Sequence, residues 1–137
     1  TIRVGRTNMT WRPVRLKQHL VDFTELVGLS EWSVAYAVAY IQSDGGEKGL
    51  ALKVGSDDQA RVYLNGERVY EYAARRTHLA DQDEVPGLEL KAGINVLVFK
   101  VVNTEGGWSG SVRLTDASGQ PLKGIRVTLD PEGKGLP

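Results

Sequence analysis

The chain has 137 residues, of which 25% are charged, and its 17 basic residues balance its 17 acidic ones. A balanced chain has no general electrostatic attraction to nucleic acid or to an anionic membrane, so we expect neither as a partner. Cysteine is absent, which excludes disulfides, thiol catalysis and zinc–thiolate sites. No apolar run is long enough for a membrane span. The chain does not begin with methionine, which indicates a piece cut from a larger protein.

The N-terminal part predicts little regular structure. Residues 1–20 are irregular, with a short strand expected over 9–14 around Trp11. Residues 21–28 hold the only helical pattern, and Gly28 would end that helix. Residues 31–43 alternate bulky and small side chains, as a strand does. We expect the bulky aromatic residues of this region to lie in the core: Trp11, Trp32, Tyr36 and Tyr40.

Residues 50–72 predict a strand, a turn, a second strand, a two-residue hairpin turn and a third strand. Asn65-Gly66 favours a type I′ turn, because both central residues tolerate a positive φ. That turn would pair Leu64 with Glu67, Val62 with Val69, and Arg61 with Tyr70. The predicted inner face contains Val62, Leu64 and Val69, and the predicted outer face contains Arg61, Tyr63, Arg68 and Tyr70.

The remaining segments continue a pattern of strands and turns. Residues 73–84 form a long polar loop, and residues 95–102 are apolar on both sides, which predicts a central and fully buried strand. Residues 103–110 form a glycine-rich loop around Trp108. About eight strands and 16 glycines predict one all-β domain over residues 1–137, an antiparallel β-sandwich or jelly roll with little helix. We expect irregular ends at about 1–9 and 130–137.

Two stretches resemble a known family. Ala60-Arg61-Val62-Tyr63-Leu64-Asn65-Gly66 is similar to an A-x-V-x-x-N-G hairpin, and residues 90–95 are similar to an L-x-x-G-x-N turn. This combination resembles the galactose-binding-like β-sandwich that accompanies many bacterial glycoside hydrolases. The stretch GSDDQARVYLNGERV also resembles the PA14 module, in which a paired-aspartate loop can hold calcium and bind sugar. Asp57 and Asp58 match that pair.

Acidic residues in two loops are the candidate metal ligands. Calcium takes six to eight oxygen ligands, which two acidic loops at one end of a sandwich could supply. The alternative is turn chemistry, in which aspartates bind their own backbone. The candidate ligands are Asp57, Asp58, Asp81 and Asp83, with Glu84 beside them.

Two further groups are candidate ligand-binding residues. Trp108, between glycines, could stack on a sugar or could fold back and fill the end of the core. In the same loop, Asn103 could donate to or accept from the sugar. The second group lies in the long loop 73–84 and could hold hydroxyls or carboxylates, or could simply be solvated. Its residues are Arg75, Arg76 and His78, with Tyr70 and Tyr72 nearby.

No motif for catalysis is present: the sequence holds no nucleophile elbow, no metalloprotease helix and no phosphate-binding loop. We therefore expect a non-catalytic carbohydrate-binding module of a secreted, periplasmic or cell-surface protein, with a glycan and neighbouring domains as partners. Structural calcium is the one cofactor that the acidic loops would suit. The alternative is a spacer or interaction domain that binds no sugar.

Overall fold

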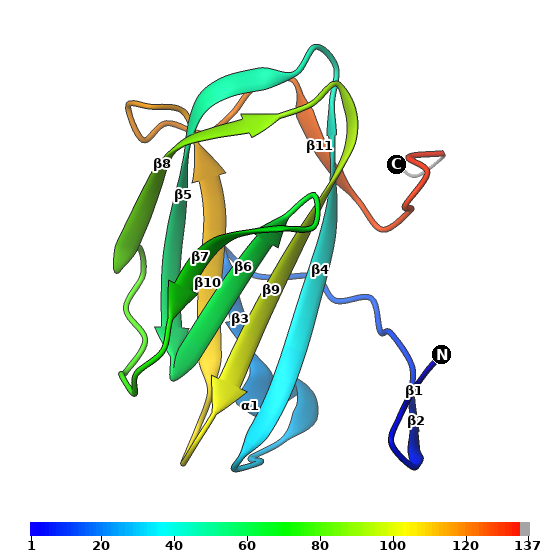
Figure 1. Ribbon diagram of the computed structural model, residues 1–137, viewed down its shortest axis with the longest axis vertical. Coiled ribbons are helices and arrows are strands. Elements are labelled where there is room, and N and C mark those ends of the chain that lie inside the picture. The colour runs from blue at the N-terminus through cyan, green and yellow to red at the C-terminus, as the bar shows by residue number, and fades with distance from the viewer. Residues whose placement is uncertain (135–137) are drawn as a thin grey trace.

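A computed structural model describes residues 1–134 and shows two antiparallel sheets packed face to face (Figure 1). One sheet contains, in spatial order, β3 (Leu20–Asp22), β10 (Ser109–Thr115), β5 (Glu47–Asp57) and β8 (Asp83–Leu90). The other contains β11 (Ile125–Thr128), β4 (Ser33–Ser43), β9 (Gly93–Asn103), β6 (Gln59–Leu64) and β7 (Glu67–Tyr72). The prediction of an all-β antiparallel sandwich is confirmed.

The core lies between the two sheets. Its most deeply buried side chains come from both of them: Leu52 and Val54 from β5, Val62 from β6, and Phe99 and Val101 from β9. None of these is more than 1% exposed. The predicted inner face of the hairpin is therefore confirmed at Val62 and Leu64, which are buried, and at Val69, which is partly buried and packs against the core.

The Asn65-Gly66 turn forms as predicted, with φ of 52° and 83° at its two central residues. The pairing of Leu64 with Glu67 is also confirmed, but Val69 has no partner because the strand bulges there. Beyond the bulge, Val62 pairs with Tyr70 and not with Val69. One extra residue shifts each later side chain by one position, so Tyr70 packs against the core, contrary to the prediction.

The face assigned to β4 was wrong. Its inward residues are the small ones: Ala35 lies beside Val101, Ala37 beside Phe99 and Ala39 beside Leu97. The small side chains leave room for these large neighbours on β9, so the inner layer packs without the aromatic residues. Three of the bulky side chains are solvent-exposed instead, with exposed fractions of 72% at Trp32, 45% at Val34 and 50% at Tyr36, while Val38 and Tyr40 are half-buried.

β9 is the central strand that the sequence predicts, with β4 on one side and β6 on the other. It is not buried on both faces. Leu97, Phe99 and Val101 face the core, while Val98 and Lys100 are only half-buried. The outer face of the five-stranded sheet is therefore open to solvent.

The N-terminal segment is more regular at its start than expected. β1 (Ile2–Val4) and β2 (Thr7–Met9) form a small hairpin that stands apart from the sandwich (Figure 1). The strand expected over 9–14 is absent, and Trp11 is 53% exposed, so its predicted place in the core is wrong. Arg12 connects this segment to the body by donating to the carbonyl of Leu26.

The helix α1 (Phe23–Val27) confirms the helical prediction, with the Asp22 side chain accepting from the N–H of Glu25 and Gly28 ending the helix. No helix in residues 1–134 is long and apolar enough to cross a membrane. Of the predicted C-terminal tail, residues 135–137 lie outside the described part of the chain.

Candidate functional site

Trp108 is a core residue, so its predicted role in stacking on a sugar is wrong. Only 3% of it is exposed, and its ring lies 5.2 Å from that of Phe23 at a tilt of 35°. Its indole N–H donates to the carbonyl of Gly28 at 3.0 Å, which satisfies the buried donor. This arrangement matches the second interpretation of the sequence, in which Trp108 folds back and fills the end of the core.

Asn103 is also fully buried and cannot reach a ligand at the surface as predicted. Its Nδ2 donates to the carbonyls of Ser30 at 2.8 Å and Gly106 at 2.9 Å, which holds the glycine-rich loop against the sheet. Its Oδ1 accepts no hydrogen bond from the described residues. Unsatisfied buried oxygens are rare in folded proteins and often indicate a bound ion or water.

The predicted polar loop 73–84 extends over residues 73–82, since β8 begins at Asp83, and Arg76 fastens it to both sheets. Arg76 donates to Ser56 Oγ on β5, to Tyr70 on β7 and to Asp83 on β8. Its guanidinium also lies 3.8 Å from the centre of the Tyr72 ring. All three guanidinium nitrogens of Arg76 therefore donate to protein groups, and its flat face contacts Tyr72.

His78 packs on the outer face of the four-stranded sheet, where its Nε2 lies 2.8 Å from Ser111 Oγ. Burial, followed by the charge of Arg76, lowers the pKa of His78 below its ordinary value. Arg75 remains exposed and pairs with Glu105 at 3.3 Å. Neither residue joins a common ligand site with Trp108 or Asn103.

Asp57 and Asp58 lie at the end of β5, next to the glycine-rich loop, and are joined by a cis peptide bond. Asp58 is 6% exposed, and its Oδ2 accepts from the backbone N–H of Thr104 at 2.9 Å and from the Thr104 hydroxyl. Asn103 directly precedes Thr104, the residue to which the Asp58 carboxylate is bonded. We call Asp57, Asp58 and Asn103 the carboxylate corner.

The other predicted metal ligands are neutralised elsewhere. Asp81 pairs with Arg113 at 2.5 Å, Asp83 pairs with Arg76 at 2.6 Å, and Glu84 pairs with Lys53. Over residues 1–134, no three acidic, histidine or cysteine side chains come close enough to hold a metal ion. The predicted four-aspartate cluster does not form: Asp81 pairs with Arg113 of β10 and Asp83 with Arg76 of the loop 73–82, away from Asp57 and Asp58.

The two aspartates of the carboxylate corner have opposite pKa shifts. Burial, the charge of Asp58 and a hydrogen bond with Asp58 raise the pKa of Asp57 above its ordinary value. Burial alone would raise the pKa of Asp58 as well. Hydrogen bonds from the Thr104 hydroxyl and from the backbone N–H groups of Thr104, Arg76 and Glu105 outweigh burial, so the pKa of Asp58 lies below its ordinary value.

These shifts predict opposite effects of Asp57→Asn and Asp58→Asn on stability. A raised pKa means that ionised Asp57 destabilises the fold once the pH exceeds that pKa, so Asp57→Asn should stabilise the protein at pH 7 without calcium. A lowered pKa means that Asp58 stabilises the fold above about pH 4 and that this is lost as the pH falls through its folded pKa. Asp58→Asn should therefore destabilise at pH 7.

Urea unfolding in chelator between pH 3 and pH 7 measures both effects. The two variants should differ most from the wild type at pH 7 and converge toward it as the pH falls through the folded pKa of each carboxyl, which Asp57 reaches at a higher pH than Asp58. A loss of stability in Asp57→Asn at pH 7 would contradict the raised pKa of Asp57.

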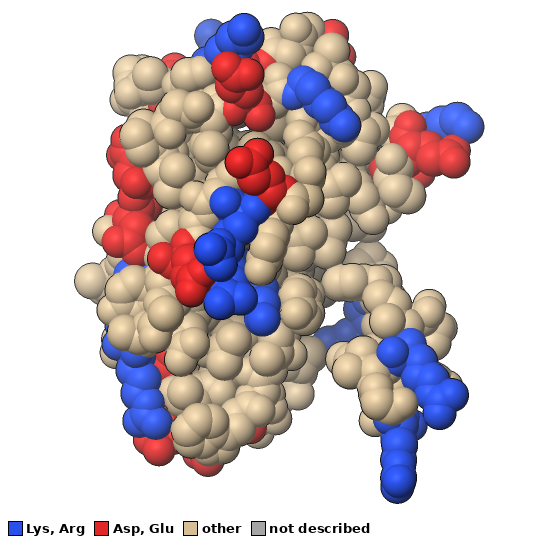
Figure 2. All heavy atoms as spheres, in the orientation of Figure 1, with Lys and Arg blue, Asp and Glu red and all other residues tan. Residues whose placement is uncertain are grey.

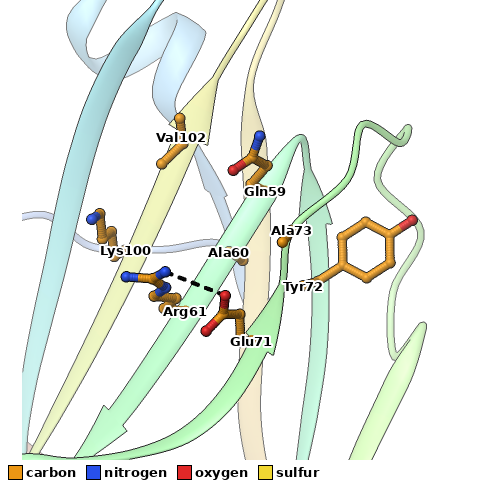
Figure 3. A pocket seen from close by; sticks show the side chains of 8 residues that line it. All are labelled: Gln59, Ala60, Arg61, Glu71, Tyr72, Ala73, Lys100 and Val102. Carbon is orange, nitrogen blue, oxygen red and sulfur yellow. Dashed lines mark hydrogen bonds and ion pairs between the residues drawn. The ribbon is translucent and has the colours of Figure 1, made fainter.

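The outer face of the five-stranded sheet holds the remaining candidate site. The residues paired across it form a row over four strands: Tyr36 on β4, Lys100 on β9, Arg61 on β6 and Glu71 on β7. Beside the row lies a shallow hollow of about 130 Å³ that is open to solvent (Figure 3).

The hollow is lined by side chains of β6, β7 and β9. Arg61 and Glu71 point toward each other across it, while the ring of Tyr72 is directed away (Figure 3). Its lining residues are Gln59, Ala60, Arg61, Glu71, Tyr72, Ala73, Lys100 and Val102. We call Tyr36, Gln59, Arg61, Glu71 and Lys100 the outer-face site.

The outer-face site adjoins the carboxylate corner along the chain. Gln59 follows Asp58, Val102 precedes Asn103, and Gln59 and Val102 are partners in the sheet. The two groups therefore meet at the start of β6 and the end of β9.

Sequence reasoning missed the outer-face site because it assigned the wrong face of β4 to the core. One signal was available. Lys100 alternates with the inward Phe99 and Val101, and a lysine is almost never fully buried without a partner. Its face, shared with Val98 and Val102, therefore had to be open.

No protein-family model matches the chain, and no curated protein matches it. A search of solved structures returns the PA14 domain of the antifreeze protein MpAFP at 17% identity and a TM-score of 0.47. The match covers 63% of this chain and 44% of that chain, so it spans less than half of the neighbour's length. This likeness is too distant to assign the chain to a family, and the galactose-binding-like resemblance is not confirmed.

Proposed function

We propose that the chain is a non-catalytic carbohydrate-binding module of a secreted or cell-surface bacterial protein, and that it binds glycan at the outer-face site. The observation that supports this most is an exposed aromatic ring in one row with polar side chains. Tyr36 is 50% exposed, and Lys100, Arg61 and Glu71 follow it across the sheet.

This row offers the two kinds of contact that a sugar needs. The Tyr36 ring presents an apolar face to the C–H groups of a pyranose. Gln59, Arg61, Lys100 and Glu71 can donate to or accept from its hydroxyls. The hollow is shallow and would cover few ligand atoms, so affinity for one sugar unit should be weak.

We propose calcium as a cofactor at the carboxylate corner. Calcium prefers oxygen ligands, and the corner offers two carboxylates and the amide Oδ1 of Asn103, which has no donor among the described residues. A cation there would also relieve the repulsion that helps to raise the pKa of Asp57. When bound, calcium would fasten the end of β5 to the start of the glycine-rich loop.

Affinity electrophoresis of the full chain through immobilised polysaccharides, with calcium or with chelator, tests this proposal. Tyr36→Ala should abolish the retardation and leave unfolding by urea nearly unchanged, because the ring is half exposed. Trp11→Ala removes an equally exposed aromatic residue far from the sheet and is the matched control.

The outcomes separate the two parts of the proposal. Retardation that survives in chelator and in Asp57→Asn would overturn the role of calcium alone. No retardation by any polysaccharide, in either condition, would overturn the carbohydrate-binding function.

A second candidate function is an interaction module that holds neighbouring domains and binds no sugar. Two observations favour it: Trp108 is buried, and the outer face is apolar around its polar row, with Val34 and Trp32 exposed. Under this alternative, Tyr36→Ala would weaken contact with a neighbouring domain in the longer protein, and glycans would have no effect on unfolding.

A further inference from the structure

Lys100 and Arg61 are like charges held directly opposite each other on one face of the sheet. They are partners in the antiparallel pairing of β9 with β6. Side chains in such a pair have Cβ atoms about 4.5–5.5 Å apart, and like charges at that distance destabilise a sheet. The fold therefore maintains an unfavourable contact at this position.

Nearby acidic groups do not cancel this charge. Glu71 lies on the far side of Arg61 at 3.2 Å and also pairs with Arg68 at 2.7 Å, so one carboxylate serves two arginines. Lys100 has no acidic partner within ion-pair distance in residues 1–134, and its ammonium lies 5.8 Å from the centre of the Tyr36 ring. Figure 2 shows a group of basic side chains at the middle of the visible face, with acidic side chains next to it.

An anion is the ligand that such a pair accommodates. A carboxylate can accept from the arginine fork with one oxygen or both and from the lysine ammonium at the same time. The hollow between the side chains of Gln59, Arg61 and Lys100 is open to solvent and so accessible to a group on a larger molecule.

We propose that Lys100 and Arg61 bind the carboxylate of a uronic acid, so that the glycan taken by this module is an acidic one. This rests on the proposed carbohydrate-binding function and names its substrate class. The sugar ring would lie toward Tyr36, which is next to Lys100 in the row, and Gln59 would contact a hydroxyl on the other side.

Titration calorimetry of the full chain against oligosaccharides of galacturonate, glucuronate, mannuronate and guluronate tests the proposal. The methyl esters of the same oligosaccharides are the matched neutral probes. We expect the best acid to bind at least tenfold more tightly than its ester, with an affinity that falls as salt rises.

Three variants locate the effect. Lys100→Gln should lose most of the preference for acid over ester, and Lys100→Arg should retain it. Lys123→Gln is the control: it removes an exposed lysine from a turn and should behave as the wild type. Because Lys100→Gln removes a like-charge contact, its stability to urea should stay equal or rise.

The outcomes distinguish this inference from the function on which it rests. Equal affinity for acid and ester, binding of neutral or sulfated glycans only, or an unchanged preference in Lys100→Gln would overturn the uronate site and leave carbohydrate binding standing. Binding of no glycan at all would overturn both.

Discussion

Trp108→Ala should lower the free energy of unfolding by about 3–5 kcal/mol, the range for removing a large aromatic side chain from a packed core. Trp108 is 3% exposed, packs on Phe23 and donates to the carbonyl of Gly28, so its loss opens a cavity and leaves that carbonyl without its donor. Urea unfolding measures the change, and the melting temperature should fall by roughly 10 °C or more.

Trp32→Ala is the control for this experiment, because it deletes the same side chain at a position that is 72% exposed. Its free energy of unfolding should change by no more than about 0.5 kcal/mol. If the two variants unfolded alike, the packing of the glycine-rich loop against α1 would be wrong, and Trp108 would return as a candidate for contact with ligand.

Gly55→Ala should destabilise the protein by about 1–3 kcal/mol, near the upper end of that range. A Cβ at this position would lie 2.0 Å from the carbonyl oxygen of Leu79 and 3.1 Å from the ring of His78. Backbone cannot rotate away as a side chain can, so the loop 73–82 would have to lift from the sheet. The hydrogen bond between His78 and Ser111 would be lost with it.

Gly45→Ala is the matched control, because a Cβ there meets nothing within 4 Å and its φ is an ordinary one. It should unfold at the wild-type urea concentration. Amide hydrogen exchange in residues 73–82 gives a second measurement, since exchange should accelerate in Gly55→Ala and not in Gly45→Ala. Wild-type exchange in Gly55→Ala would show that the loop does not rest on β5.

The fold could be predicted because its strongest signals are local. The Asn65-Gly66 turn requires positive φ at two successive residues, and the alternation through β6 fixes which side chains face inward. The short helix and its end at Gly28 follow from the same kind of signal. The bulge at Val69 could not be predicted, because nothing in the sequence of β7 distinguishes it from a regular strand.

The site was harder to predict because it depends on which sheet face meets the other sheet. Alternation in β4 shows two faces and does not say which is buried. The answer lies in β9, whose large inward residues leave room only for the alanines of β4. Likewise, a glycine-rich loop with one tryptophan has the same sequence whether the ring points out or in. The ring points inward because it packs against Phe23 of α1, and the sequence of the loop does not show this contact.

The bulge at Val69 also bears on how this protein avoids aggregation. β7 is an outermost strand of its sheet, and an outermost strand with free backbone groups can recruit another chain into a growing sheet. An unpaired residue twists the strand and breaks the regular spacing of those groups. The neighbouring border strand, β8, contains Pro86, which has no N–H to offer. This side of the sandwich is thereby poorly suited to templating fibrils.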